Sequence, residues 1–285
     1  MSLHVEEFGS GEPLLLIHGW GMHGGMWGSV AERLARDFCV IAVDLPGHGF
    51  SQDGGAEDAG WVERSDTHRL SEAGGGYRYA QPTLQGSLDS IVDELSAQFR
   101  EPLNLCGWSL GGQVALRWAQ LHPQQVRRLV LVTSTPCFVR HPGWDCAMAE
   151  QTLAEFAAAL EQNYALTLRR FLALQVRGSE DERELLAELR NALFSRGEPE
   201  LVALQSGLNI LRDCDLREAL PQIAQPALVI AGERDTLTPP DASRYIAERM
   251  PQARLALVEG AAHAPFLSHP DRFVACIKDF LKERT

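Results

Sequence analysis

The sequence predicts an α/β fold in which a mostly parallel sheet is flanked by helices and carries an inserted helical cap. Short apolar runs alternate with helical patterns along most of the 285-residue chain, as they do in parallel α/β sheets. The runs are apolar at consecutive positions, which is typical of strands that helices cover on both faces. Residues 137–220 interrupt the alternation with a long helix-rich segment that has no strand signal. This segment is the predicted cap.

Each predicted element follows from a local pattern of apolar residues bounded by turn residues. Strands are expected at residues 14–18, 39–43, 103–106, 129–132, 227–231 and 255–258. Helices are expected at residues 26–35, 88–99, 110–121, 241–250 and 271–282. The predicted domains are a core, residues 1–136 and 221–285, and a cap, residues 137–220.

One segment fits neither pattern. Residues 52–83 are polar and rich in glycine, and their apolar residues follow neither the helical nor the strand period. Loops of this length are usually functional or lack a fixed structure. We therefore expect residues 52–83 to form a mobile surface insertion in the core.

Composition excludes several classes of function. The formal net charge of −12 argues against nucleic acid as a main partner, because phosphate binding needs a basic face. No apolar run is long enough to cross a bilayer, and the first residues lack the pattern of a secretion signal. The six cysteines are scattered along the chain, which fits a reduced compartment. We expect a cytoplasmic monomer without a metal or cofactor.

The five residues at 107–111, Gly-Trp-Ser-Leu-Gly, stand where a predicted strand gives way directly to a predicted helix. A tight turn of this form pushes the serine hydroxyl out of the sheet. Gly107 and Gly111 leave room for the strand and the helix to pass close together. The helix N-terminus supplies N–H groups and positive potential for an oxyanion. Ser109 is therefore a candidate nucleophile.

Ser109 needs a base to remove its proton, and two later strand ends supply candidates. Asp235 and His263 each follow a predicted strand, and the carboxyl ends of parallel strands meet at one edge of a sheet. His263 is the candidate base. Asp235 is expected to fix the tautomer of His263 and to stabilise its imidazolium form.

Other polar residues are weaker candidates, because they lie in backbone-shaping motifs, at helix ends or at the exit of the cap. They are His18, His48, His122, His269, Asp213 and Asp215. No set of histidine, cysteine and acidic residues has the spacing of a metal site, and the expected chemistry needs no metal.

The motif His-Gly-Trp-Gly at residues 18–21 follows the first predicted strand. In a site of this kind the first N–H donor to the oxyanion is the residue that follows the nucleophile. The position of this motif suits the second donor. We assign the two donors of the oxyanion hole to the backbone N–H groups of Trp20 and Leu110. The indole of Trp20 is also expected to act as a packing aromatic.

Taken together, these motifs resemble the α/β-hydrolase superfamily, and more closely the pimeloyl-[acyl-carrier protein] methyl ester esterases of biotin synthesis. The likeness covers nearly the whole chain except residues 52–83. The residues that carry it are HGWG at 18–21, DLPGHG at 44–49, GWSLGG at 107–112, TSTPCF at 133–138, GERD at 232–235, RFLALQ at 170–175 and AAHAPFLSHP at 261–270. The triad motifs indicate only the superfamily, whereas the cap motif at 170–175 points to the family.

The resemblance implies a serine carboxylesterase that hydrolyses the methyl ester of pimeloyl-[acyl-carrier protein], releasing pimeloyl-[acyl-carrier protein] and methanol. It also implies that the acyl chain threads between sheet and cap, and that basic cap residues meet the acidic carrier. The residues expected to contact the substrate are Trp20, Ser109, Leu110, Phe171, Leu172, Ala173, Leu174, Gln175 and His263.

The spacing of four arginines in the cap independently favours docking of an acidic carrier. Arg170 and Arg177 are seven residues apart, as are Arg183 and Arg190, so each pair is able to share a helix face. Acidic residues stand among them, so a solvated helical surface is the alternative interpretation. We assign carrier docking to Arg170, Arg183 and Arg190.

Three other functions remain open at this point. A general short-chain carboxylesterase or a C–C bond hydrolase would use the same triad. A catalytically silent ligand-binding protein would use the same fold, although loss of the triad would be the expected mark of that class. A haloalkane dehalogenase is disfavoured because its nucleophile is an aspartate. The fold alone does not decide the substrate.

Overall fold

The computed structural model describes residues 3–52 and 87–283. Within these residues the chain forms a seven-stranded sheet in the order β1-β3-β2-β4-β5-β6-β7. All pairs are parallel except the antiparallel pair of β1 with β3 at the edge. The strands are β1 (Val5–Gly9), β2 (Pro13–Ile17), β3 (Cys39–Val43), β4 (Leu103–Trp108), β5 (Val126–Val132), β6 (Ala227–Gly232) and β7 (Ala253–Val258).

The structure confirms the predicted mostly parallel α/β sheet and all six predicted strands, with ends that differ by a few residues. Strand β1 was not predicted, and its residues are only partly buried or exposed. Two consecutive glutamates, Glu6 and Glu7, break its apolar pattern. An edge strand has one unpaired side and a face open to water, so it needs no continuous apolar run.

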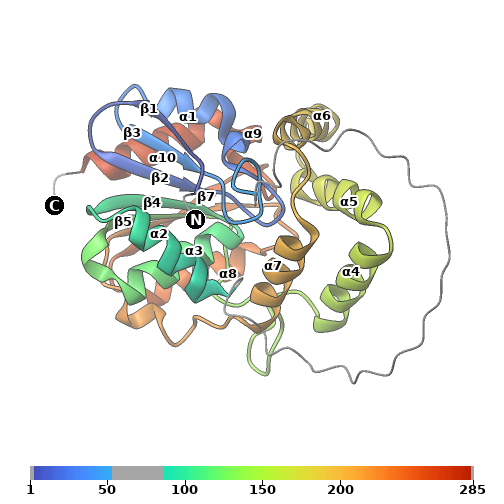
Figure 1. Ribbon diagram of the computed structural model, residues 1–285. Helices are drawn as coiled ribbons and strands as arrows, with labels where there is room; N and C mark the ends of the chain where they lie inside the picture. Colours follow the sequence, from blue (N-terminus) through green and yellow to red (C-terminus); the bar gives the residue numbers. More distant parts are fainter. Residues whose placement is uncertain (1–2, 53–86, 284–285) are drawn as a thin grey trace, which may run out of the picture.

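Helices cover both faces of the sheet (Figure 1). On one face α1 (Gly28–Leu34) contacts α10 (Pro270–Lys282), and on the other α2 (Leu88–Gln98) contacts α3 (Leu110–Leu121). The helix α8 (Pro240–Arg249) packs on β6 and β7, and the short α9 (Pro265–Ser268) precedes α10. The helix expected at 26–35 is divided into a 3₁₀ turn, η1 (Gly24–Trp27), and α1. The division falls at Gly28, the first residue of α1, which adopts a positive φ.

Four helices lie between β5 and β6 in the chain and stand beside the end of the sheet (Figure 1). They are α4 (Glu150–Gln162), α5 (Tyr164–Val176), α6 (Glu182–Leu193) and α7 (Leu201–Asp213), with a 3₁₀ turn, η3 (Phe194–Arg196), after α6. We call residues 137–220 the cap, and its boundaries stay a prediction. The predicted insertion at 52–83 lies, apart from Gln52, outside the described residues.

The positions of four arginines refine the expected helix faces of the cap. Arg183 and Arg190 both lie in α6, and so share one helix as predicted. Arg170 lies in α5, but Arg177 follows the last residue of that helix. The spacing of seven between Arg170 and Arg177 therefore does not place them on one helix face. The following residue, Gly178, has a φ of +89°, which ends the helical path.

A buried ion pair connects the cap to the core. The guanidinium of Arg196, in η3, lies 3.1 Å from Oδ1 of Asp44 and also pairs with Glu6 of β1. The side chains of Arg196 and Asp44 are 8% and 0% exposed. Nearby, Nε2 of His23 lies 2.9 Å from the carbonyl oxygen of Ala192 at the end of α6. The cap therefore meets the core through charged and polar contacts, of which the Arg196–Asp44 pair is buried.

Asp44 is held as a carboxylate by more than Arg196. Burial favours its neutral form, but the N–H groups of Phe50 and Gly24 donate to the carboxylate, and with Arg196 they lower its pKa from the usual 3.8. A carboxyl group whose pKa is lower in the folded than in the unfolded protein stabilises the fold at any pH above its unfolded-state pKa. This stabilisation is lost as the pH falls through its folded-state pKa. We therefore expect this contact to weaken only in acid.

Replacement of Arg196 tests the energy of this contact. Arg196→Met is expected to lower the free energy of unfolding by about 3 kcal/mol at neutral pH, because it leaves the Asp44 carboxylate buried without its partner. Urea denaturation monitored by circular dichroism measures the change. The control is Arg212→Met, which breaks an exposed pair with Asp213 and should cost less than about 1 kcal/mol. Equal small losses in both variants would contradict the assignment.

Candidate active site

Ser109 occupies a strained turn between β4 and α3. Its φ of +55° lies in the left-handed region that residues other than glycine seldom adopt. The backbone holds this turn, because the N–H of Ser109 donates to Val132 at 2.9 Å and its carbonyl accepts from the hydroxyl of Ser134 at 2.8 Å. Ser109 is the N-cap residue of α3, yet its side chain makes no capping hydrogen bond. The hydroxyl is therefore not committed to the helix.

Two glycines let the backbone segments of this turn approach one another. A Cβ atom on Gly107 would lie 2.2 Å from the carbonyl oxygen of Gly111. A Cβ atom on Gly111 would lie 2.3 Å from the carbonyl oxygen of Ile17 in β2. Both distances are well inside van der Waals contact with backbone atoms that have no room to move. The expectation that Gly107 and Gly111 are needed for close packing is confirmed.

Asp235 and His263 meet at the same end of the sheet. Nδ1 of His263 lies 2.8 Å from Oδ2 of Asp235, and their side chains are 1% and 0% exposed. Oδ1 of Asp235 accepts the N–H groups of Leu237 and Thr238 at 2.8 and 3.1 Å, a local turn typical of aspartate. The carboxylate thus orients the imidazole with its proton on Nδ1, which leaves Nε2 as a proton acceptor.

Three residues that the sequence analysis did not select hold this pair beside the serine turn. The indole N–H of Trp108 and the hydroxyl of Thr133 donate to the carbonyl oxygen of His263 at 2.9 and 2.7 Å. The hydroxyl oxygen of Thr238 lies 2.7 Å from Oδ2 of Asp235. Trp108 and Thr133 stand in the motifs at 107–112 and 133–138, but neither motif indicates that the partner is the distant His263. Thr238 follows Asp235 by three residues, and this proximity is the sequence signal for their contact.

The loop at residues 18–21 lies against the serine turn. A Cβ atom on Gly19 would lie 3.2 Å from Cβ of Ser109. Behind it, Nδ1 of His18 donates to the carbonyl of Gly19 at 2.8 Å, and Nε2 accepts from the N–H of Leu45 at 2.9 Å. Burial, together with the neighbouring His48, lowers the pKa of His18 to about 3. His18 is therefore neutral and shapes the backbone of this loop, as expected.

The two expected oxyanion donors lie on this loop and on α3. Leu110 is the first residue of α3, where backbone N–H groups have no partner within the helix. Trp20 is 2% exposed, and its indole N–H donates to the carbonyl of Leu204 in α7 at 2.8 Å. The expected packing role of the Trp20 indole is confirmed. Its backbone N–H role in an oxyanion hole stays a prediction.

An apolar pocket of about 80 Å³ lies between the cap and this end of the sheet. Residues that line it include Trp20, Phe156, Phe171, Leu174, Leu208 and Leu237. Of the five cap residues expected to line an acyl passage, Phe171 and Leu174 line this pocket, and their contact with substrate stays a prediction. Leu172 is buried in the hydrophobic core, Ala173 is half-buried and the side chain of Gln175 is buried. Gln175 acts through its backbone instead, because its carbonyl accepts the N–H of His263 at 3.1 Å.

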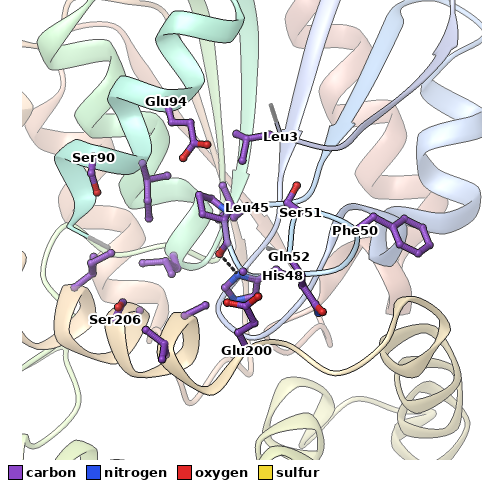
Figure 2. A pocket seen from close by; sticks show the side chains of 18 residues that line it. Leu3, Leu45, His48, Phe50, Ser51, Gln52, Ser90, Glu94, Glu200 and Ser206 are labelled. Carbon is purple, nitrogen blue, oxygen red and sulfur yellow. Dashed lines mark hydrogen bonds between the residues drawn. The ribbon is translucent and has the colours of Figure 1, made fainter. Parts of the chain in front are cut away.

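A wider cleft of about 540 Å³ opens beside α7, α2 and the loop that follows β3 (Figure 2). Leu110 and Gly207 contribute to its lining, so it adjoins the serine turn. Figure 2 shows polar side chains around it, with the ring of His48 bonded to the backbone of Pro46 at 2.9 Å. The labelled polar residues are His48, Ser51, Gln52, Ser90, Glu94, Glu200 and Ser206.

The three arginines assigned to carrier docking are all exposed on the cap. No ion pair joins Arg170, Arg183 or Arg190 to an acidic side chain in the part of the chain that the structure describes.

One cluster of possible metal ligands lies outside this site. Ligand atoms of Cys137, His141 and Asp215 come within 4.8 Å of one another where the cap joins the core. Sequence spacing missed this set because Asp215 is remote from the other two residues. The carboxylate of Asp215 is already paired with Arg217 at 2.6 Å, and Sγ of Cys137 lies 3.3 Å from the carbonyl of Val139. All six cysteines are free thiols.

Residues 12–270 match the model of a family described as having the alpha/beta hydrolase fold. A protein from Nitrosomonas europaea named pimeloyl-[acyl-carrier protein] methyl ester esterase is 42% identical over 275 residues, which cover 96% of this chain and 98% of that protein. A protein of the same name from Nitrosospira multiformis is 38% identical over 99% of both chains.

Solved structures share the fold. An esterase from Exiguobacterium antarcticum has a TM-score of 0.81 at 22% identity, and the match covers 99% of this chain and 96% of that one. An enol-lactonase from Burkholderia xenovorans has a TM-score of 0.76 at 20% identity over 99% and 96% of the chains. In the described residues no helix is both long and apolar enough to cross a membrane.

The close packing at the serine turn predicts a large difference between two glycine substitutions. Gly111→Ala is expected to lower the free energy of unfolding by about 3 kcal/mol or more, because the new Cβ meets the backbone of β2. Gly143→Ala is the control, since its φ is +76° but no atom lies within 4 Å of its Cβ position, and it should cost about 1 kcal/mol. Chemical denaturation measures both. If Gly111→Ala lowers the free energy of unfolding no more than Gly143→Ala does, the turn is not tightly packed.

Proposed function

The chain belongs to the α/β-hydrolase superfamily and, within it, to the family of pimeloyl-[acyl-carrier protein] methyl ester esterases, and we propose that it hydrolyses the methyl ester of a pimeloyl chain held on an acyl-carrier protein. The products are pimeloyl-[acyl-carrier protein] and methanol, in biotin synthesis. The observation that carries the chemistry is the buried Asp235–His263 hydrogen bond beside the strained turn of Ser109. The relatives' names supply the substrate.

In the first half of the reaction, the hydroxyl oxygen of Ser109 attacks the carbonyl carbon of the ester. Nε2 of His263 takes the hydroxyl proton, while Asp235 stabilises the imidazolium through Nδ1. The carbonyl oxygen becomes an oxyanion, which the N–H groups of Trp20 and Leu110 stabilise. His263 then gives its proton to the departing methoxide, so methanol leaves and the acyl group stays on Ser109.

Water completes the reaction. His263 removes a proton from a water molecule, whose oxygen attacks the same carbonyl carbon. A second oxyanion forms and collapses, the bond to Ser109 breaks, and the serine oxygen recovers its proton from His263. The product is the free carboxylic acid of the carrier-bound chain. The resting state of all three residues is thereby restored.

The apolar pocket suits the methylene chain of the substrate, because its lining is almost entirely hydrocarbon and aromatic. Phe171 and Leu174 come from α5 of the cap, and Leu237 comes from the loop after Asp235. The acyl chain would thus lie between cap and sheet. The exposed Arg170, Arg183 and Arg190 would meet the acidic carrier outside. The cytoplasmic location and the monomeric state expected from the sequence stay predictions.

Loss of the nucleophile tests the reaction itself. Ser109→Ala is expected to lower kcat for ester hydrolysis by about 10⁴-fold or more, because the remaining site offers only oxyanion binding and positioning. The matched control is Ser195→Ala at an exposed position of the cap, which should keep wild-type turnover. Wild-type turnover in folded Ser109→Ala protein would refute the mechanism.

Charge reversal on the cap separates a carrier-dependent esterase from a general short-chain esterase or a C–C hydrolase. Arg170→Glu, Arg183→Glu and Arg190→Glu together should lower kcat/KM for the carrier-bound ester about tenfold or more and reduce its salt dependence. Hydrolysis of p-nitrophenyl acetate should stay near wild type, since it needs no docking.

A matched control reverses three exposed arginines of the core, Arg36, Arg249 and Arg272. This control changes the net charge equally and should affect both substrates little. Equal losses for both substrates in the cap variant would indicate a misfolded cap. An unchanged carrier reaction in a correctly folded cap variant would contradict docking at these arginines.

A further inference from the structure

A glycine in the middle of α7 contacts the candidate site. Gly207 is buried at the seventh position of the thirteen-residue helix Leu201–Asp213. Glycine is one of the poorest helix formers, because it loses the most backbone freedom on folding. Its presence in a regular helix interior calls for a packing reason, and the side chain of Trp20 provides one.

The helix backbone at Gly207 lies directly against the indole of Trp20. A Cβ atom on Gly207 would lie 2.5 Å from Cδ1 of Trp20 and 3.0 Å from its Nε1. The same indole donates through Nε1 to the carbonyl of Leu204, one turn earlier in α7. Any side chain at position 207 would therefore have to displace the indole from the helix.

The indole also packs against two aromatic rings of α4 and α5. It meets Phe171 and Phe156 edge-on, with ring centroids 4.7 and 5.5 Å away. These three rings line the apolar pocket between the cap and the sheet. Gly207 itself lines the wider cleft, to which Trp20 does not contribute. A displaced indole would therefore fill part of the apolar pocket.

We propose that Gly207 is a specificity-determining residue, which keeps the apolar pocket open for a long acyl chain by allowing the Trp20 indole to lie against α7. This inference rests on the proposed esterase function, in which the pocket receives the methylene chain. The residue acts through Trp20 and takes no part in the chemistry. A short acyl group does not reach the part of the pocket that the displaced indole would fill.

The test compares two esters with Gly207→Ala. We expect kcat/KM for p-nitrophenyl hexanoate to fall about tenfold or more relative to p-nitrophenyl acetate, because the additional methylenes lose their apolar contacts. The control is Asn209→Ala, at an exposed position of the same helix. It also raises helix propensity but should leave the ratio between the two esters unchanged.

A second substitution distinguishes this contact from a general disturbance of the fold. Alanine at position 20 keeps the backbone N–H but has no ring to meet position 207, so in a Trp20→Ala background the Gly207→Ala change should alter the hexanoate-to-acetate ratio less than about twofold. An unchanged ratio in the Gly207→Ala single variant would overturn the proposal. An equal loss for both esters, or a loss that persists in the Trp20→Ala background, would also overturn it.

Binding separates this proposal from the proposed function. In a Ser109→Ala background, Gly207→Ala should weaken the binding of dimethyl pimelate about tenfold by calorimetry. If wild-type protein hydrolyses neither ester, the esterase assignment fails, while weakened binding still supports the role of Gly207. If hydrolysis is normal and dimethyl pimelate binds equally with glycine or alanine at 207, the role of Gly207 fails and the esterase assignment stands.

Discussion

The close approach of three backbone segments around the serine turn is the constraint on which the candidate site depends. β4, α3 and β2 come together because Gly107 and Gly111 have no Cβ atoms. This packing forces Ser109 into a positive φ, which turns the residue out of the regular strand and helix geometry. The loop at residues 18–21 then lies against Ser109. The nucleophile and one oxyanion loop thus share a single packing arrangement.

Hydrogen bonds from distant parts of the chain fix the remaining groups relative to this turn. Trp108 and Thr133 hold the backbone of His263, and Asp235 orients its ring. The cap contributes two hydrogen bonds at the site itself, from His263 to the carbonyl of Gln175 and from the Trp20 indole to the carbonyl of Leu204. Farther out, Arg196 connects the cap to buried Asp44. The cap is therefore anchored to the core both beside the candidate triad and away from it.

Features encoded by local patterns were predictable from the sequence. The apolar runs gave the parallel strands, and α3 begins and ends at the predicted residues. The order of Ser109, Asp235 and His263 at strand ends predicted their convergence, and the Asp235–His263 hydrogen bond agrees with it. Features that depend on tertiary contacts were not predictable. Strand β1 lacks an apolar pattern. No sequence motif indicates that Arg196 pairs with Asp44 or that Gly207 contacts Trp20.

In the proposed reaction the methyl ester of the carrier-bound chain is cleaved and the thioester is left intact. Wild-type protein should be incubated with methyl pimeloyl-[acyl-carrier protein] in water enriched in oxygen-18, and the carrier analysed as an intact protein by mass spectrometry. The account predicts a carrier that keeps its acyl chain, loses the methyl group and gains one heavy oxygen. A carrier that keeps its methyl ester, or that loses the whole acyl chain as monomethyl pimelate, would contradict it.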